Sequence, residues 1–343
     1  MYNIYDYINY YKDSSLEEVP WNIMDNLICS CIVYSPIKEF HIAKDIEYLH
    51  IEINKRDNFG KSDLMTPKVK RILTLLVGSK RYKDLMIIDY TDKVNAKTQF
   101  GAMTFKIGKT KIISFKGSDG CLIGWQENFR IAYEYPTYTH TLAINYLNEH
   151  INFSDKNVYV CGHSKGGNLA LVSAMEINSF KFNKIKEIHN FDGPGLRKQE
   201  FESKKYLKVK DKLVNIVPEA SYVGVLMYSE NLNVVTTNEL GINVHFPTSW
   251  NIFGEHFVTG KLTLFSKELH NSSTKKVENL DYDKVRETME MAFKTVKKEY
   301  SSRINLKLKD FIDILKGLAG ADKETTKYII TIITAMIKGS KKK

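Results

Sequence analysis

Cysteine is scarce in this chain of 343 residues, and so are the patterns that mark metal sites and cofactor sites. Two of the four cysteines fall within predicted core elements, and their spacing is not that of metal ligands. No glycine-rich phosphate loop occurs either. The sequence therefore predicts a protein of the reducing cytoplasm that needs no metal ion and no cofactor. The cysteines are Cys29, Cys31, Cys121 and Cys161.

Segments for secretion and membrane insertion are also lacking. Residues 1–15 contain acidic side chains and no cationic stretch followed by an apolar core, so they do not predict a secretory signal. The longest apolar stretch, residues 328–337, is too short to span a bilayer. The net charge of +10 comes with lysines interleaved among glutamates, which is typical of a solvated surface, and we expect no nucleic-acid partner.

The chain does contain enough apolar residues, 43% of the total, for one large core with an appendage or for two modest domains. From about residue 110 onward, strand-like and helical patterns alternate, which indicates a mostly parallel sheet with helices on both faces. The helical patterns cover 4–11, 21–35, 69–77, 136–150 and 168–177. The strand-like patterns cover 85–90, 98–107, 111–115, 158–161, 184–191, 212–217, 232–236 and 243–246.

One short motif carries the main chemical signal. Gly162, Ser164 and Gly166 form Gly-x-Ser-x-Gly, the pattern that places a nucleophilic serine on a sharp turn between a strand and a helix. The flanks fit, because an apolar run precedes the motif and a helical pattern follows it. The two glycines allow strained angles and close backbone packing. The amide of Lys165, the first of the new helix, would point at a developing oxyanion. The alternative is a glycine-rich turn with an incidental serine.

A second motif lies upstream, where the strand 111–115 runs into Lys116, Gly117 and Ser118, followed by Trp125 and Asn128. This segment resembles the oxyanion loop of class 3 lipases. The resemblance implies an α/β-hydrolase fold in which Ser118 gives its backbone amide, and often its hydroxyl, to the oxyanion. The same family usually has leucine at position 165, a difference that should matter little because the catalytic group there is the amide.

Four further segments resemble a family of uncharacterised lipase-like bacterial proteins, the Mbeg-like family. They are GHSKGGNLA (162–170), FDGPG (191–195), PEASYVG (218–224) and HFPTSW (245–250). This resemblance implies a fold and a site but no substrate.

The serine needs a base, and the base needs an acid that orients it. In this fold the expected chain order is serine, acid, histidine. His245 and His256 are the two candidate bases. His245 is favoured because it ends the alternating run 242–244 and begins a loop that contains Pro247, and because of the family resemblance. The acid is open: Asp192 follows the strand 184–191, Glu219 lies in the next loop, or the triad is incomplete. Class 3 lipases have an aspartate where this chain has Ser221, Tyr222, Val223 and Gly224.

The expected organisation is an α/β-hydrolase domain over 1–280 and a helical extension over 281–343. Within the domain, residues 1–82 form a helical N-terminal part, either a cap or ordinary peripheral helices, and residues 83–280 form the catalytic core. The extension has helical patterns at 281–298, 306–318 and 323–338. The last one combines isoleucines with terminal lysines, which suits either peripheral contact with an anionic inner membrane face or packing on the hydrolase body.

The resulting hypothesis is a serine hydrolase that cleaves a carboxylic ester or lipid through an acyl-enzyme on Ser164. His245 would act as base, Asp192 as acid, and the amides of Lys165 and Ser118 as oxyanion donors. The alternatives are a non-catalytic binding protein and a membrane-associated protein, each on an α/β-hydrolase scaffold.

Overall fold

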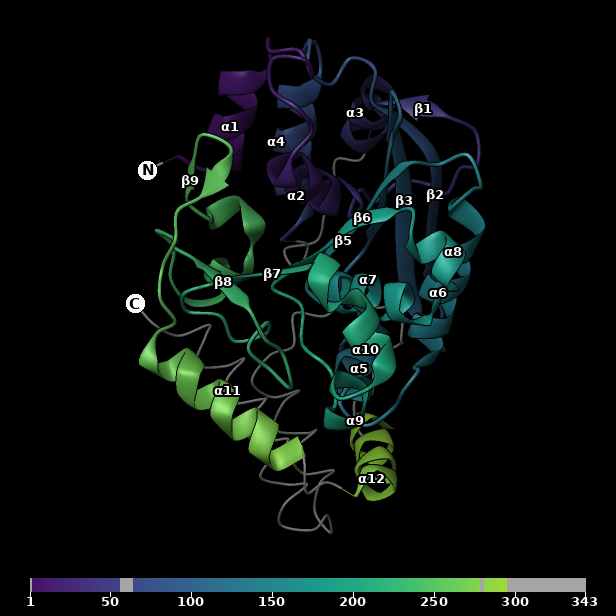
Figure 1. Cartoon of the computed structure of the whole chain (residues 1–343), viewed down its shortest axis with the longest axis vertical. Helices are drawn as coiled ribbons and strands as arrows, with labels where there is room; N and C mark the ends of the chain where they lie inside the picture. The colour runs from purple at the N-terminus through teal and green to yellow at the C-terminus, as the bar shows by residue number, and fades with distance from the viewer. Residues whose placement is uncertain (1, 56–63, 278–280, 295–343) are drawn as a thin grey trace.

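The computed structural model describes residues 2–55, 64–277 and 281–294, and a sheet of eight strands lies at its centre (Figure 1). Neighbouring strands in the sheet are also neighbours in the sequence. Strands β1 to β4 pair antiparallel, whereas β4 to β8 pair parallel. The strands are β1 (Lys44–Asp45), β2 (Met86–Val94), β3 (Gln99–Ile107), β4 (Thr110–Phe115), β5 (Asn157–His163), β6 (Ile185–Phe191), β7 (Leu213–Pro218) and β8 (Leu232–Val235).

Strand β5 shows why both faces of the sheet are covered. Its residues alternate, with Tyr159 and Cys161 in one apolar cluster and Val158 and Val160 in another. Helix α2 (Ile23–Ile32) lies against the first face and α7 (Lys165–Glu176) against the second. Because successive side chains of a strand point to opposite faces, an apolar strand of this kind needs a helix on each side. The structure therefore confirms the predicted mostly parallel sheet with helices on both faces.

The N-terminal helices belong to the first of these clusters. They gather at one end of the view in Figure 1, where α4 packs against α1, α2 and α3. Both α1 and α2 begin with a capping box, in which Asn3 or Asn22 pairs with the aspartate three residues later. Among the described residues, this part therefore covers a face of the sheet as peripheral helices do. The bounds are α1 (Ile4–Tyr11), α3 (Ile46–Asn54) and α4 (Thr66–Leu76).

The second face is covered by α6 and α7, and shorter helices complete that side. The remaining helices are α5 (Leu122–Arg130), α6 (Tyr138–His150), α8 (Ser179–Phe182), α9 (Lys198–Phe201) and α10 (Lys204–Val209), followed by α11 (Leu264–Val277) and α12 (Tyr282–Lys294). A small hairpin of β9 (Ile252–Phe253) and β10 (His256–Phe257) stands apart from the main sheet.

Most predicted elements are present, and one is of another kind than expected. The segment predicted as a strand at 243–246 is instead the 3-10 helix Gly241–His245. Ile242 is 39% exposed while Val244 is buried, so these two residues do not share the buried face that a strand would give them. The helix after the serine starts at Lys165, which agrees with the expectation that the Lys165 amide is the first of that helix.

The C-terminal region is described only in part. Helix α12 confirms the prediction for 281–298 as far as Lys294. The rest of that range and the predicted helices 306–318 and 323–338 lie outside the described residues. Among the described helices, none combines the length and apolar character that a bilayer span requires. All four cysteines are buried free thiols.

His140, a buried histidine of helix α6, connects this helix through Asn168 of helix α7 to the turn after strand β6. The Thr137 amide donates to His140 Nδ1 at 3.0 Å, and His140 Nε2 lies 2.7 Å from Asn168 Oδ1. Because the amide oxygen can only accept, Nε2 carries the proton. Asn168 in turn donates to the backbone oxygens of Pro194 and Gly195, in the turn after β6. Burial lowers the pKa of His140 to about 4, so the ring is neutral at pH 7.

We expect this histidine to make the fold sensitive to acid. The folded-state pKa lies below the unfolded value, so the unfolded chain takes up the proton first as pH falls, and stability is lost between about pH 6.5 and pH 4. The amide of Gln is not protonated in this range. His140→Gln should therefore reduce the fall in the free energy of unfolding between pH 7 and pH 4 by on the order of 3 kcal/mol. Urea unfolding at a series of pH values from 7 to 4 measures this free energy. The control His256→Gln changes an exposed side chain, and its free energy of unfolding should depend on pH as that of the wild type does. The same pH dependence in wild type and His140→Gln would contradict the prediction.

Candidate active site

The serine of the motif sits on a strained turn. Strand β5 ends at His163, α7 begins at Lys165, and Ser164 between them has φ 59° and ψ −131°. A positive φ is costly for a residue with a side chain and persists only where the surroundings hold it. Here the Ser164 amide donates to the Phe191 oxygen at 2.9 Å, and the Gly167 amide donates to the Ser164 oxygen at 2.9 Å. The turn is therefore fixed from both sides.

The two motif glycines are required by close backbone packing. A Cβ at Gly162 would lie 2.2 Å from the Gly166 oxygen, and a Cβ at Gly166 would lie 2.0 Å from the Phe115 oxygen. Backbone atoms cannot yield at such distances, so no larger residue fits. This is the role that the motif predicts for both glycines.

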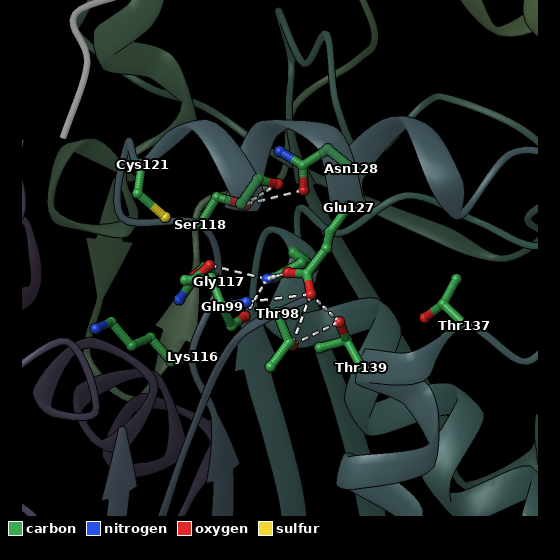
Figure 2. Close-up of polar contacts among 12 residues, drawn as sticks. Thr98, Gln99, Lys116, Gly117, Ser118, Cys121, Glu127, Asn128, Thr137 and Thr139 are labelled. Carbon is green, nitrogen blue, oxygen red and sulfur yellow. Dashed lines mark hydrogen bonds and ion pairs between the residues drawn. The ribbon is translucent and has the colours of Figure 1, made fainter. Parts of the chain in front are cut away.

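The loop after β4 lies against the serine. A Cβ at Gly117 would come within 3.1 Å of Ser164 Cβ and within 2.1 Å of the Tyr34 hydroxyl. Ser118 Oγ donates to Asn128 Oδ1 at 2.9 Å, toward helix α5, with the Gly124 oxygen at 3.3 Å as a second acceptor (Figure 2). The hydroxyl of Ser118 is thus engaged with α5, and the group that this residue can offer to an oxyanion is its backbone amide.

His245 and Asp192 form a hydrogen-bonded pair beside this turn. His245 Nδ1 lies 2.6 Å from Asp192 Oδ2, although the two residues are 53 positions apart in the sequence. The carboxylate is fully buried, and the histidine side chain is 13% exposed. A neutral imidazole that donates from Nδ1 keeps its lone pair on Nε2, the arrangement that a general base requires.

The carboxylate of Asp192 has two further donors. Ser221 Oγ donates to Oδ1 at 2.5 Å, and the Gly224 amide donates to the same oxygen at 3.0 Å. A Cβ at Gly224 would lie 2.4 Å from that oxygen, so this close approach requires glycine. The aspartate itself has φ 50° and adopts the left-handed conformation that Asp tolerates better than most residues. Asp192 thus caps a backbone amide and contacts the histidine at the same time.

A second histidine supports the backbone of the first. His163 Nε2 lies 2.8 Å from the backbone oxygen of His245, and since a carbonyl only accepts, Nε2 carries the proton. Its Nδ1 accepts from the Tyr34 hydroxyl at 3.2 Å. Burial holds the pKa of His163 well below its usual value, so the ring stays neutral. The neutral His163 therefore connects the 3-10 helix that carries His245 to strand β5 and to the segment just after helix α2.

The other candidate residues lie apart from this group. His256 is exposed in the β9–β10 hairpin, and Glu219 is half-buried after β7. Among the described residues, neither side chain makes a hydrogen bond to Asp192 or His245.

The hydroxyl of Ser164 makes no hydrogen bond to any other described residue. Catalytic hydrogen bonds are often long in ligand-free enzymes and tighten when substrate binds. Within the described part of the chain, no group of three His, Cys, Asp or Glu side chains is arranged to hold a metal ion.

Several residues at the site have roles that the sequence does not predict. Ser221 stands where class 3 lipases have an aspartate, which gives no hint that it donates to Asp192. Tyr34 and Gln99 carry no signal because their partners are far away in the sequence. For Lys165 the motif predicts a role of the backbone amide and none of the side chain. A charged residue within an otherwise apolar, buried helix does indicate a buried partner, but its spacing does not say which one.

Comparison with known proteins places the site within a family. The sequence profile described as Mbeg1-like matches residues 76–294. The chain belongs to the Mbeg1-like family. The matched region of this Mbeg1-like chain includes the elbow, the loop after β4, Asp192 and His245. Among solved structures, the chain is similar to the crystal structure of M37 lipase, with 13% sequence identity and a TM-score of 0.41 over 91% of this chain and 97% of that one. Comparison with curated proteins gives no match.

We expect Ser221→Ala to destabilise this Mbeg1-like protein more than an ordinary buried serine would. The change leaves one oxygen of a buried carboxylate with a single donor, and hydrogen bonds to charged groups contribute about 1.5–3 kcal/mol. The matched control is Ser173→Ala, which removes an equally buried hydroxyl that donates to the Ala170 backbone oxygen and should cost about 1 kcal/mol or less. Urea unfolding at pH 7 compares them, and equal losses would contradict a special role for Ser221.

Proposed function

We propose that the protein is a serine hydrolase that cleaves a carboxylic ester, of a lipid or of another acyl compound, through an acyl-enzyme on Ser164. The observation that supports this best is the 2.6 Å contact between His245 and a fully buried Asp192, formed beside a serine held at positive φ. A buried aspartate paired with a histidine next to a strained serine is the set of groups that acyl transfer needs.

In the proposed reaction, Ser164 Oγ attacks the acyl carbonyl while its proton passes to His245 Nε2. Asp192 stabilises the imidazolium that forms and keeps the ring in place. The amides of Lys165 and Ser118 donate to the oxyanion of the tetrahedral intermediate; each donor of this kind contributes about 3 kcal/mol to lowering the barrier. His245 then protonates the leaving alcohol. Water attacks the acyl-enzyme by the same route in reverse and releases the acid. No step needs a cofactor.

Reaction with an alkyl fluorophosphonate tests the nucleophile, the base and the oxyanion donors together. We expect wild-type protein to gain one phosphonyl group on Ser164, and Ser164→Ala to gain none. His245→Ala and Asp192→Asn should slow the labelling by about three orders of magnitude or more, because the serine then lacks a correctly oriented base. Intact-mass spectrometry over time measures the rates.

Two variants test the alternative base and the alternative acid. His256→Ala and Glu219→Gln should label at the wild-type rate, since neither side chain contacts the His245–Asp192 pair. A fall in the His256→Ala rate with normal His245→Ala labelling would move the base to His256. Folded wild-type protein that is not labelled at all would contradict a hydrolase and favour a binding protein on this scaffold.

A further inference from the structure

The side chain of Lys165 is buried directly behind the nucleophile. Its ammonium group is 0% exposed and has three acceptors: the Gln99 backbone oxygen at 2.6 Å, Gln99 Oε1 at 2.8 Å and Glu127 Oε2 at 2.5 Å. An ammonium group has three hydrogens, so each is used. With every hydrogen engaged and no lone pair, Lys165 does not act as a base for Ser164.

The partner carboxylate is equally well satisfied. Glu127 comes from helix α5, and its Oε1 accepts from the Thr98 hydroxyl at 2.7 Å, from the Gln99 amide at 3.2 Å and from the Thr139 hydroxyl (Figure 2). Buried charges are costly unless they are paired and hydrogen-bonded. This pair meets both conditions.

Gln99 extends the network to the loop after β4. Its Nε2 donates to the Gly117 backbone oxygen at 3.2 Å (Figure 2). Its Oε1 accepts from Lys165. One side-chain amide therefore joins the first residue of α7 to the peptide that precedes Ser118. Helix α5 contacts the same loop, because Asn128, next to Glu127, accepts from the Ser118 hydroxyl.

We propose that the side chains of Lys165, Glu127 and Gln99 are positioning residues that fix the two oxyanion amides, those of Lys165 and Ser118, at the separation that the reaction requires. This inference rests on the proposed function. Two donors stabilise one oxyanion only if both lie about 2.7–3.1 Å from it. The Lys165 amide is held by its helix, whereas the Ser118 amide belongs to a loop, and loops are more mobile than the elements they join. A hydrogen bond from a strand side chain to the loop backbone removes that freedom.

An ion pair that only stabilises the core and one that positions a loop differ in what their removal does to reactivity. A buried pair is often replaceable by apolar residues with little loss of stability. If Lys165 and Glu127 only held the core together, reactivity would follow stability in every variant. If they position the loop, reactivity falls even where stability is recovered.

The main test is Gln99→Met, which removes both side-chain contacts of Gln99 but leaves its backbone oxygen and the Lys165–Glu127 pair in place. With p-nitrophenyl butyrate as probe ester, we expect kcat to fall about 10- to 100-fold with little change in KM, because a displaced donor acts on the transition state. The second-order rate of fluorophosphonate labelling should fall by a similar factor.

A second pair of variants separates charge from position. Lys165→Met leaves the Glu127 carboxylate buried without its partner, and we expect lower stability and slower labelling. Lys165→Met/Glu127→Gln removes both charges and should regain stability without regaining the labelling rate.

The matched control is Lys111→Met, at the start of β4. Lys111 is another buried lysine, 6% exposed, with its ammonium 2.5 Å from Asp155 and 2.8 Å from the His150 oxygen. We expect Lys111→Met to lower the free energy of unfolding and to keep the wild-type labelling rate. The rates are measured under conditions in which circular dichroism shows that every variant is folded.

The outcomes are distinct. If the wild type reacts and Gln99→Met has an unchanged kcat, the positioning role is overturned and the proposed function stands. The same holds if the labelling rates follow the free energies of unfolding in all variants, including Lys111→Met. A wild type that reacts with neither probe would overturn the proposed function and this inference with it.

Discussion

The buried charge of Asp192 is the constraint around which the site is arranged. A carboxylate removed from water must be surrounded by donors, and here the donors come from separate segments: His245, Ser221 and the Gly224 amide. The loops after β6 and β7 and the segment after β8 are thereby drawn together at the carboxyl ends of parallel strands, the edge at which sites form in open α/β sheets. The position of His245 next to the elbow follows from that contact.

Around the serine, close packing and buried polar groups have complementary roles. Gly162, Gly166 and Gly117 allow the backbones of β5, α7 and the loop after β4 to approach. The polar groups then fix the parts that packing leaves free: His163 secures the backbone of His245, and Gln99 secures the loop at Gly117. The two histidine rings lie 4.5 Å apart, and the neutral state of His163 avoids placing a second positive charge beside His245 during the proposed reaction.

Much of the fold was predictable because its signals are local. The alternation of strand-like and helical patterns indicates the parallel sheet, and the glycines around Ser164 indicate the turn without reference to any tertiary contact. The strand predicted at 243–246 was wrong because four residues carry too little periodicity to distinguish a strand from a 3-10 helix. The domain division, the cytoplasmic location and the membrane contact of the C-terminal helix stay predictions.

By itself, the sequence determined the elbow: Gly-x-Ser-x-Gly between a strand and a helix is a local pattern, and local backbone sterics are sufficient to specify it. Only the tertiary structure decided which carboxylate meets His245, and it brought Asp192 rather than Glu219 to that ring. It also decided the partners of the Lys165 side chain, for which the motif predicts no role. Such contacts join residues 38 to 66 positions apart, and no short-range pattern encodes a pairing that only the packing of the whole sheet and its helices creates.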